Sequence, residues 1–110
     1  MINYINLDKT EAFAKLLSLA PLGKAFDFRT QLTAKRVVES VTPMAASLHY
    51  SWAAKAVNDS VLDTLQELAS EQQLIEKYQA LLDGECMNPG EQRKVLHHLL
   101  RGQLGKDVVH

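Results

Sequence analysis

Apolar residues recur three and four positions apart along much of this chain, in segments that open on helix-capping residues. The run Asn88-Pro89-Gly90-Glu91 combines an N-cap, a proline at the first helical position and a glutamate three residues after the cap. Gly102 supplies a residue at which a helix readily ends. The apolar face between them is Val95, Leu96, Leu99 and Leu100. This spacing predicts an α-helix over residues 88–101.

Two more helices are predicted in the middle of the chain. Asn58-Asp59-Ser60 offers a side-chain cap and a negative charge to a helix N-terminus. The polar run Glu71-Gln72-Gln73 interrupts the apolar stripe, and Gly84 is placed where a left-handed residue closes the second helix. The two stripes are Val61, Leu62, Leu65, Leu68 and Ala69, then Leu74, Ile75, Tyr78, Leu81 and Leu82.

A further helix is predicted near the N-terminus. Asp8 precedes Glu11 by three positions, so the Asp8 side chain can accept hydrogen bonds from free N–H groups while Glu11 reaches back. The run Pro21-Leu22-Gly23 should end this helix near Leu19. The apolar stripe between these limits is Ala12, Phe13, Leu16, Leu17 and Ala20.

The segment between these helices has a weaker pattern. Residues 24–43 fit neither the helical nor the strand period cleanly, and we expect part of the segment to be helical. Leu48–Trp52 alternates apolar and polar residues, as a half-buried strand does. Its expected partner is the β-branched run Arg36–Val41, with Thr42-Pro43 in the turn.

The predicted fold class is therefore mainly α. With 5 Gly and 3 Pro against abundant Leu and Ala, the composition favours helices. We expect residues 1–110 to form a single small helical region of about four helices with a short β-hairpin around residues 36–53. Hydrophobic residues make up 46% of the chain, which is close to the average of globular proteins and argues against a disordered tail.

The charge balance bears on the class of partner. Lys and Arg number 12 against 13 Asp and Glu, and they do not gather on one face, so neither nucleic acid nor a membrane is an expected partner. The longest nearly apolar stretch, Leu16–Leu22, is far shorter than the roughly 20 residues that span a bilayer. We expect a cytoplasmic protein.

Candidate chemistry is sparse. His97 and His98 are adjacent and project about 100° apart on a helix, so they would not share a metal ion easily. Cys86 is the single cysteine, and no histidine, including His49, is assigned as its base. We expect Cys86 to be a buried or half-buried thiol and His97 a packing residue. Glycine-rich phosphate loops are absent from the sequence.

The aromatic and basic residues also have ordinary roles in this prediction. Large rings usually supply core area, and we expect this of Phe26, Phe28, Tyr50 and Trp52. Scattered cations are typical of solvated faces, and we expect this of Lys35, Arg36, Arg93, Lys94 and Arg101.

Residues 81–101 resemble a segment of the glucose-6-phosphate isomerase family. In that family a helix ends in Gly-Glu-Lys-hydrophobic-Asn, and the next helix reads Glu-x-Arg-x-Val-Leu-His-x-x-Leu-Arg. The resemblance extends back through residues 61–69 and 45–48 and forward to the Gly-Lys-Asp-Val at 105–108, so that it covers roughly residues 36–108. The positions matched without a gap are Gly84, Glu85, Met87, Asn88, Glu91, Arg93, Val95, Leu96, His97, Leu100 and Arg101.

The chain also departs from the family pattern. Ser51-Trp52-Ala53-Ala54 stands where the family commonly has Asp-Tyr-Ser-Lys, so that Ser51 and Ala54 remove both charges. Cys86 replaces a lysine, and Gly102-Gln103 stands where Asn-Arg is usual. The resemblance is therefore to a divergent member, in which the polar contacts of these positions differ.

The resemblance implies an N-terminal region of a longer enzyme that interconverts glucose 6-phosphate and fructose 6-phosphate in glycolysis and gluconeogenesis. The family's phosphate-holding loop, its proton-shuttling glutamate and its ring-opening His and Lys all lie downstream of this segment. The resemblance thus assigns no catalytic, cofactor-binding or metal-binding residue here, and Glu85, Arg93, His97 and Arg101 inherit only a scaffolding part.

Two functions remain open from the sequence. In the first, the chain is inactive by itself and its partner is the remainder of the isomerase chain. In the second, it is a stand-alone helical module for protein–protein interaction without enzymatic activity. Because excised helices leave apolar faces uncovered, we expect the isolated chain to form a homodimer or higher oligomer.

Overall fold

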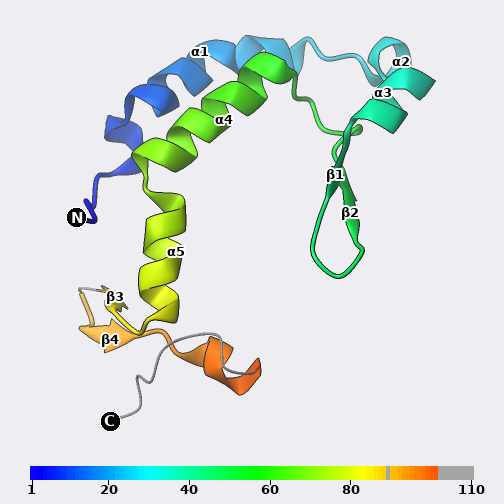
Figure 1. The fold of residues 1–110 in the computed structure, drawn as a ribbon. Coiled ribbons are helices and arrows are strands. Elements are labelled where there is room, and N and C mark those ends of the chain that lie inside the picture. The colour runs from blue at the N-terminus through cyan, green and yellow to red at the C-terminus, as the bar shows by residue number, and fades with distance from the viewer. Residues whose placement is uncertain (89, 102–110) are drawn as a thin grey trace.

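The computed structural model describes residues 1–88 and 90–101 as short helices and two small hairpins (Figure 1). The helical elements in chain order are η1 (Leu7–Lys9), α1 (Glu11–Lys24), α2 (Phe28–Gln31), α3 (Ala34–Glu39), α4 (Asp59–Glu71), α5 (Leu74–Leu82) and η2 (His97–Arg101). The antiparallel hairpins pair β1 (Val41–Pro43) with β2 (His49–Ser51) and β3 (Cys86–Asn88) with β4 (Arg93–Lys94). The mainly α fold class with a small hairpin is thus confirmed.

Helices α1 and α4 form the main packed pair and lie side by side, running in opposite directions (Figure 1). Ala12 of α1 is fully buried and Thr64 of α4 nearly so. Ala12 and Thr64 are small enough to let two helix backbones approach closely. Helix α5 turns away from this pair and leads to β3 and β4 (Figure 1).

The predicted first helix exists, but both predicted ends were wrong. Its N-cap is Thr10, whose hydroxyl accepts a hydrogen bond from the Phe13 N–H at 3.2 Å, while Asp8 lies in the preceding turn η1. The helix passes through Pro21 to Lys24, and the Pro21 carbonyl still accepts from the Ala25 N–H at 3.0 Å. Proline removes one N–H donor from the helix but leaves its own carbonyl available to the next turn.

The two central helices lie where the sequence places them. Asn58 is the N-cap of α4, and its side chain accepts from the Val61 N–H at 2.9 Å. The polar run at 71–73 separates α4 from α5, with Gln73 in the left-handed region at φ 50°. Gly84 follows α5 with φ 79°, a conformation that costs glycine little. These predictions are confirmed.

The predicted hairpin exists, but its first strand is shorter than expected. Residues 36–39 belong to α3 because Thr33 caps that helix, its hydroxyl accepting from the Arg36 N–H at 3.2 Å. The cap outweighs the β-propensity of the adjacent valines. Pro43 lies within β1 and pairs with His49 rather than forming the turn. The turn is 44–48, where Ala46 and Ser47 have positive φ.

The helix predicted over 88–101 was wrong. Residues 86–88 and 93–94 form the paired strands β3 and β4, and residues 97–101 form the 3-10 turn η2. Gln92 has a φ of 52°, a left-handed conformation that is common in turns. Leu100 is 89% exposed. A cap alone does not hold a short helix, which depends on burial of its apolar face against another element. Here Val95, Leu96 and Leu99 are only half-buried, and no described helix packs along the segment as α1 packs along α4.

The chain has little core of its own. The buried apolar residues of the described part are Ala12, Ala53 and Ala80, and no large side chain there is fully buried. The radius of gyration is 18.1 Å and the extents are 57 × 36 × 20 Å. A compact domain of this length has a radius of gyration of about 13 Å. The molecule is elongated, with its apolar surface spread along it.

Among the described residues, no helix is both long enough and apolar enough to cross a bilayer.

Candidate docking face

The accessible surface of the molecule is larger than folding alone would leave. It measures 8838 Å², whereas a compact monomer of 12.3 kDa has about 6,100 Å² by the usual scaling of area with mass. The excess of about 2,700 Å² is the area that one side of a large obligate interface covers. Exposed large apolar side chains contribute to it, including Leu17 at 60% and Ile75 at 76%.

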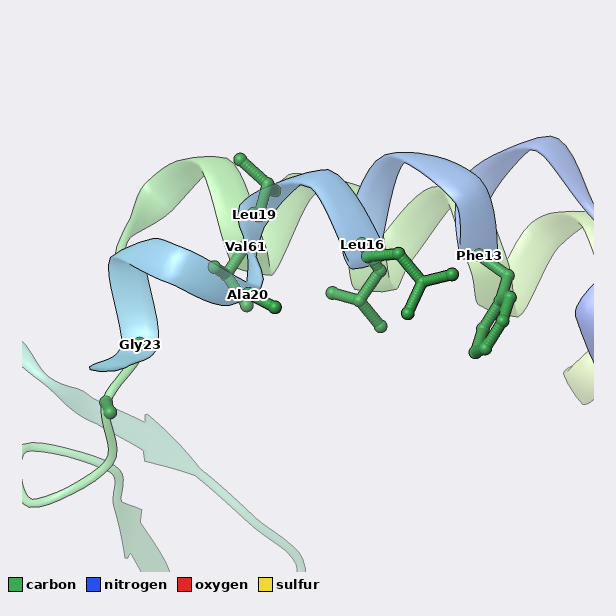
Figure 2. Close-up of a pocket in the computed structure, with 8 residues that line it drawn as sticks. Phe13, Leu16, Leu19, Ala20, Gly23 and Val61 are labelled. Atoms are coloured by element: carbon green, nitrogen blue, oxygen red, sulfur yellow. The ribbon is translucent and has the colours of Figure 1, made fainter. Parts of the chain in front are cut away.

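One groove on this surface runs along the α1–α4 pair (Figure 2). Phe13, Leu16 and Ala20 are spaced along α1, and Val61 comes from α4. The helical spacing of three and four residues places them along one side of α1. The groove has a volume of about 260 Å³, and its lining is almost entirely apolar. The remaining lining residues are Leu17, Leu19, Gly23 and Ala56. We call this the α1 groove.

A charged pair ties α1 to α4. The Lys15 ammonium donates a hydrogen bond to the Glu67 carboxylate, and both side chains are exposed. The hydrogen bond to Glu67, together with the attraction of its charge, raises the pKa of Lys15 above 10.5. Because solvent screens exposed pairs, the contact orients the two helices more than it stabilises them.

The polar run 71–73 binds the N-terminal segment. The Glu71 carboxylate accepts from the N–H groups of Glu11 at 3.0 Å and Ala12 at 2.8 Å, so a residue of α4 caps the start of α1. Gln72 donates to the Ile5 carbonyl at 3.0 Å. Sequence reasoning predicted only an interruption here, because partners about 60 to 70 positions away leave no local signal.

Gln73 completes this attachment. Its side-chain oxygen accepts from the Asn3 N–H at 2.6 Å, and its amide nitrogen donates to the Met1 carbonyl at 3.0 Å. The left-handed backbone of Gln73 ends α4 and starts α5 at a new angle. The N-terminal segment therefore fastens to the joint between α4 and α5.

A second set of contacts joins α3 to the chain ahead of α4. The Arg36 guanidinium donates from Nε to the Ala53 carbonyl at 2.8 Å and from one terminal nitrogen to Lys55 at 2.8 Å and Val57 at 3.0 Å. It also lies 4.7 Å from the Phe26 ring and 5.6 Å from the Trp52 ring. We call this the Arg36 cluster.

The Arg36 cluster corrects one prediction from the sequence. Arg36 is not a simple solvated cation, because it satisfies three backbone carbonyls. Charged donors are well suited to carbonyls that secondary structure leaves unpaired. Lys35, Arg93 and Lys94 are exposed as expected, and the side chain of Arg101 lies outside the described residues.

The aromatic prediction was only partly right. Phe26 and Trp52 are half-buried, but Phe28 is 42% exposed and Tyr50 is 49% exposed. Phe26 and Phe28 meet edge to face with centroids 4.8 Å apart. The elongated shape leaves no interior that could enclose all of these rings.

Cys86 and His97 were both expected to pack, and both predictions were wrong. Cys86 lies exposed in β3, and its thiol donates to the Arg93 carbonyl at 3.6 Å. His97 is exposed in η2, because the helix that would have packed it does not form. Within residues 1–88 and 90–101, no group of three His, Cys, Asp or Glu could hold a metal ion. The side chain of His98 lies outside the described residues.

Three of the divergent positions, Ser51, Ala54 and Cys86, lie on exposed surface, whereas Trp52 is half-buried and Ala53 is buried. Ser51 pairs with Val41 in the first hairpin and Ala54 lies beside the Arg36 cluster, both exposed. Cys86 is exposed as well, and Gly102 lies outside the described residues. Ser51 and Ala54 therefore place uncharged side chains in solvent where the family commonly has charged ones.

The comparisons with known proteins agree on one family. The family model of phosphoglucose isomerase matches residues 50–110. Glucose-6-phosphate isomerase from Borreliella burgdorferi (strain ZS7) is 47% identical over 110 residues, which cover 99% of this chain and 20% of that protein. The enzyme from Treponema denticola is 46% identical, covering 96% of this chain and 21% of that protein.

The match is thus nearly complete for this chain and partial for its relatives. Glucose-6-phosphate isomerase from Treponema pallidum (strain Nichols) is 42% identical, covering 91% of this chain and 19% of that protein. The chain spans about a fifth of the length of the curated relatives it matches. No solved structure shows significant similarity to it.

Proposed function

The chain belongs to the phosphoglucose isomerase family, and we propose that it forms the N-terminal structural region of a glucose-6-phosphate isomerase. The whole enzyme would interconvert glucose 6-phosphate and fructose 6-phosphate in glycolysis and gluconeogenesis, in the cytoplasm. In this proposal residues 1–110 are a single helical region, and their partner is the remainder of the isomerase chain.

The observation that carries the proposal is the match of almost the entire chain to a fifth of each relative. The excess surface supports it independently. A region that evolved to lie against a larger body keeps apolar faces that it does not cover itself, and the α1 groove is such a face. Nucleic acid and membranes are not partners in this proposal.

The proposal assigns no catalysis to the chain alone. Aldose–ketose isomerisation needs a held phosphate and an acid or base within hydrogen-bonding reach of the carbon that loses its proton. The α1 groove presents mainly carbon, and the Arg36 guanidinium is already committed to three carbonyls. The chain therefore acts as a scaffold.

A chimeric enzyme tests the proposal. This chain replaces the matching fifth of the Borreliella burgdorferi isomerase, and a coupled assay measures formation of glucose 6-phosphate from fructose 6-phosphate. We expect a folded, active chimera, because the two regions are 47% identical over almost the entire length of this chain. A soluble chimera with a native-like circular dichroism spectrum but no activity would contradict the proposal.

The chain by itself supplies the complementary test. We expect no turnover in the same assay and, by light scattering, a homodimer or larger species, because uncovered apolar faces associate. Turnover would overturn the scaffolding role. A strictly monomeric chain with a cooperative thermal transition, beside an inactive chimera, would favour the stand-alone interaction module.

A further inference from the structure

A second and larger groove lies between the β1–β2 hairpin and α4. Its volume is about 490 Å³, nearly twice that of the α1 groove. Tyr50 and Trp52 form the hairpin side, and Leu62 and Leu65 of α4 form the opposite side. The lining is almost wholly apolar. The other lining residues are Thr42, Lys55 and Val57. We call this the hairpin groove.

The Arg36 cluster orders one wall of this groove in the absence of a partner. Arg36 holds the carbonyls of Lys55 and Val57 at 2.8 and 3.0 Å, and its guanidinium lies against Trp52. The backbone of the segment between β2 and α4 is therefore fixed without any partner. A preformed apolar groove binds with a smaller loss of conformational entropy than one that must order on binding.

The hairpin groove lies in the part of the chain that the family model describes. Of its lining residues, Thr42 alone falls outside the matched range 50–110. By contrast, Ala56 and Val61 are the lining residues of the α1 groove within that range. The range that the family model matches therefore contains nearly all of the lining residues of the hairpin groove and few of those of the α1 groove.

The positive charge of Lys55 at the edge of the hairpin groove indicates that the occupant carries a negative charge. Lys55 is exposed, and within the described residues its ammonium makes no hydrogen bond or ion pair. The rest of the lining presents an apolar surface to a partner. An apolar segment that ends in a carboxylate matches both properties, because a cation beside a desolvated groove favours an anion.

We propose that the hairpin groove is the docking site for an apolar segment of the remaining isomerase polypeptide, with an acidic residue that pairs with Lys55. This inference rests on the proposed function. The length of the relatives supports the choice of occupant, since about four fifths of each lies outside the region that matches this chain.

Photocrosslinking in the active chimera identifies the occupant. A benzophenone amino acid replaces Leu65, which is 40% exposed, and mass spectrometry identifies the peptide joined to it. We expect a peptide from the Borreliella burgdorferi part of the chimera with apolar residues next to an Asp or Glu. A crosslink to residues 1–110 of a second copy would overturn the inference.

Matched substitutions measure the contribution of the groove. We expect Leu65→Gln to lower the melting temperature of the chimera by about 2 °C or more. Lys55→Glu should lower it as well, and Lys55→Arg should not. The control is Val38→Gln in α3, because Val38 is 77% exposed and lines neither groove. In the isolated chain, Leu65→Gln should leave the circular dichroism spectrum unchanged.

The outcomes separate this inference from the proposed function. An inactive parent chimera counts against the proposed function before any groove variant is made. An active parent chimera whose stability is lowered by Val38→Gln as much as by Leu65→Gln counts against the hairpin groove alone. A crosslink from position 65 to a peptide that has neither apolar nor acidic residues also counts against the hairpin groove alone.

Discussion

Helix α4 and the segment 88–101 begin with the same kind of sequence signal and adopt different structures. Asn58 caps α4, which runs for 13 residues beside α1. Asn88 opens a stretch with a similar cap and a similar apolar stripe, yet residues 90–101 form strand β4 and a 3-10 turn. The two regions differ in what their apolar faces meet.

The comparison separates local from tertiary stabilisation. An N-cap contributes about 1 kcal/mol, whereas burial of one large apolar side chain contributes about 1.5–3 kcal/mol. Helix α4 has both, because Leu62 and Leu68 are half-buried. In the later segment Val95, Leu96 and Leu99 are half-buried as well, but Leu100 is 89% exposed, and no described helix packs along the segment as α1 packs along α4. A capping signal therefore sets where a helix begins once packing has made it stable.

The largest expected effect comes from disturbing the α1–α4 contact. Ala12→Leu places a branched side chain where Ala12 is 0% exposed, which should cost about 1–3 kcal/mol. Thermal unfolding followed by circular dichroism measures the loss. The control is Ala14→Leu on the exposed side of α1. If both variants melt alike, α4 does not depend on packing against α1.

The next effect comes from the cap that α4 provides to α1. Glu71→Ala leaves the N–H groups of Glu11 and Ala12 without their carboxylate and should cost about 1–2 kcal/mol. Urea unfolding measures this difference. Glu76→Ala on the exposed surface of α5 is the matched control, with a smaller expected loss of about 0.3–1 kcal/mol, because Glu76 lies in the first turn of that helix. An equal loss in the control would show that the effect comes from removing a negative charge and not from losing the two hydrogen bonds to α1.

Two leucine-to-alanine variants compare α4 with the C-terminal segment directly. Leu68→Ala should cost about 1 kcal/mol, because Leu68 is only half-buried. Leu100→Ala should change the free energy of unfolding by less than about 0.5 kcal/mol. Both variants are measured by denaturant unfolding. A large loss from Leu100→Ala would mean that the C-terminal segment has a packing partner.

The smallest effect concerns the exposed pair between Lys15 and Glu67. Because this contact raises the folded-state pKa of Lys15 above 10.5, its stabilisation is fully present below pH 10.5. It is lost as the pH rises through the higher folded-state value. The melting temperature of wild type should therefore exceed that of Lys15→Met slightly at neutral pH, and the two should converge above pH 10.5. A gap that widens at high pH would contradict this assignment.

Features set by neighbouring residues could be predicted from the sequence. The Asn58 cap, the break at Gln73 and the closing Gly84 depend on side chains within a few positions. The family was predictable too, because its motif is local and continuous. The ends of α1 were not, since Thr10 competes with Asp8 and the helix continues through Pro21.

Features set by distant residues could not be predicted. The contacts of Glu71 with Ala12 and of Arg36 with Ala53 join positions that are far apart, and their residue types are ordinary for a surface. Cys86 is exposed in strand β3, which pairs with β4 across a stretch that the local pattern predicts as helical. The hairpin groove likewise needs the Arg36 cluster before Trp52 and α4 can enclose it.

The placement of Trp52 gives the molecule an intrinsic optical probe. Trp52 is the single tryptophan of the chain and lies against Arg36 on one wall of the hairpin groove. A guanidinium beside an indole, and a groove that is open to water, both influence fluorescence emission. Excitation of this residue therefore reports on loosening of the Arg36 cluster and on arrival of an occupant, without any label.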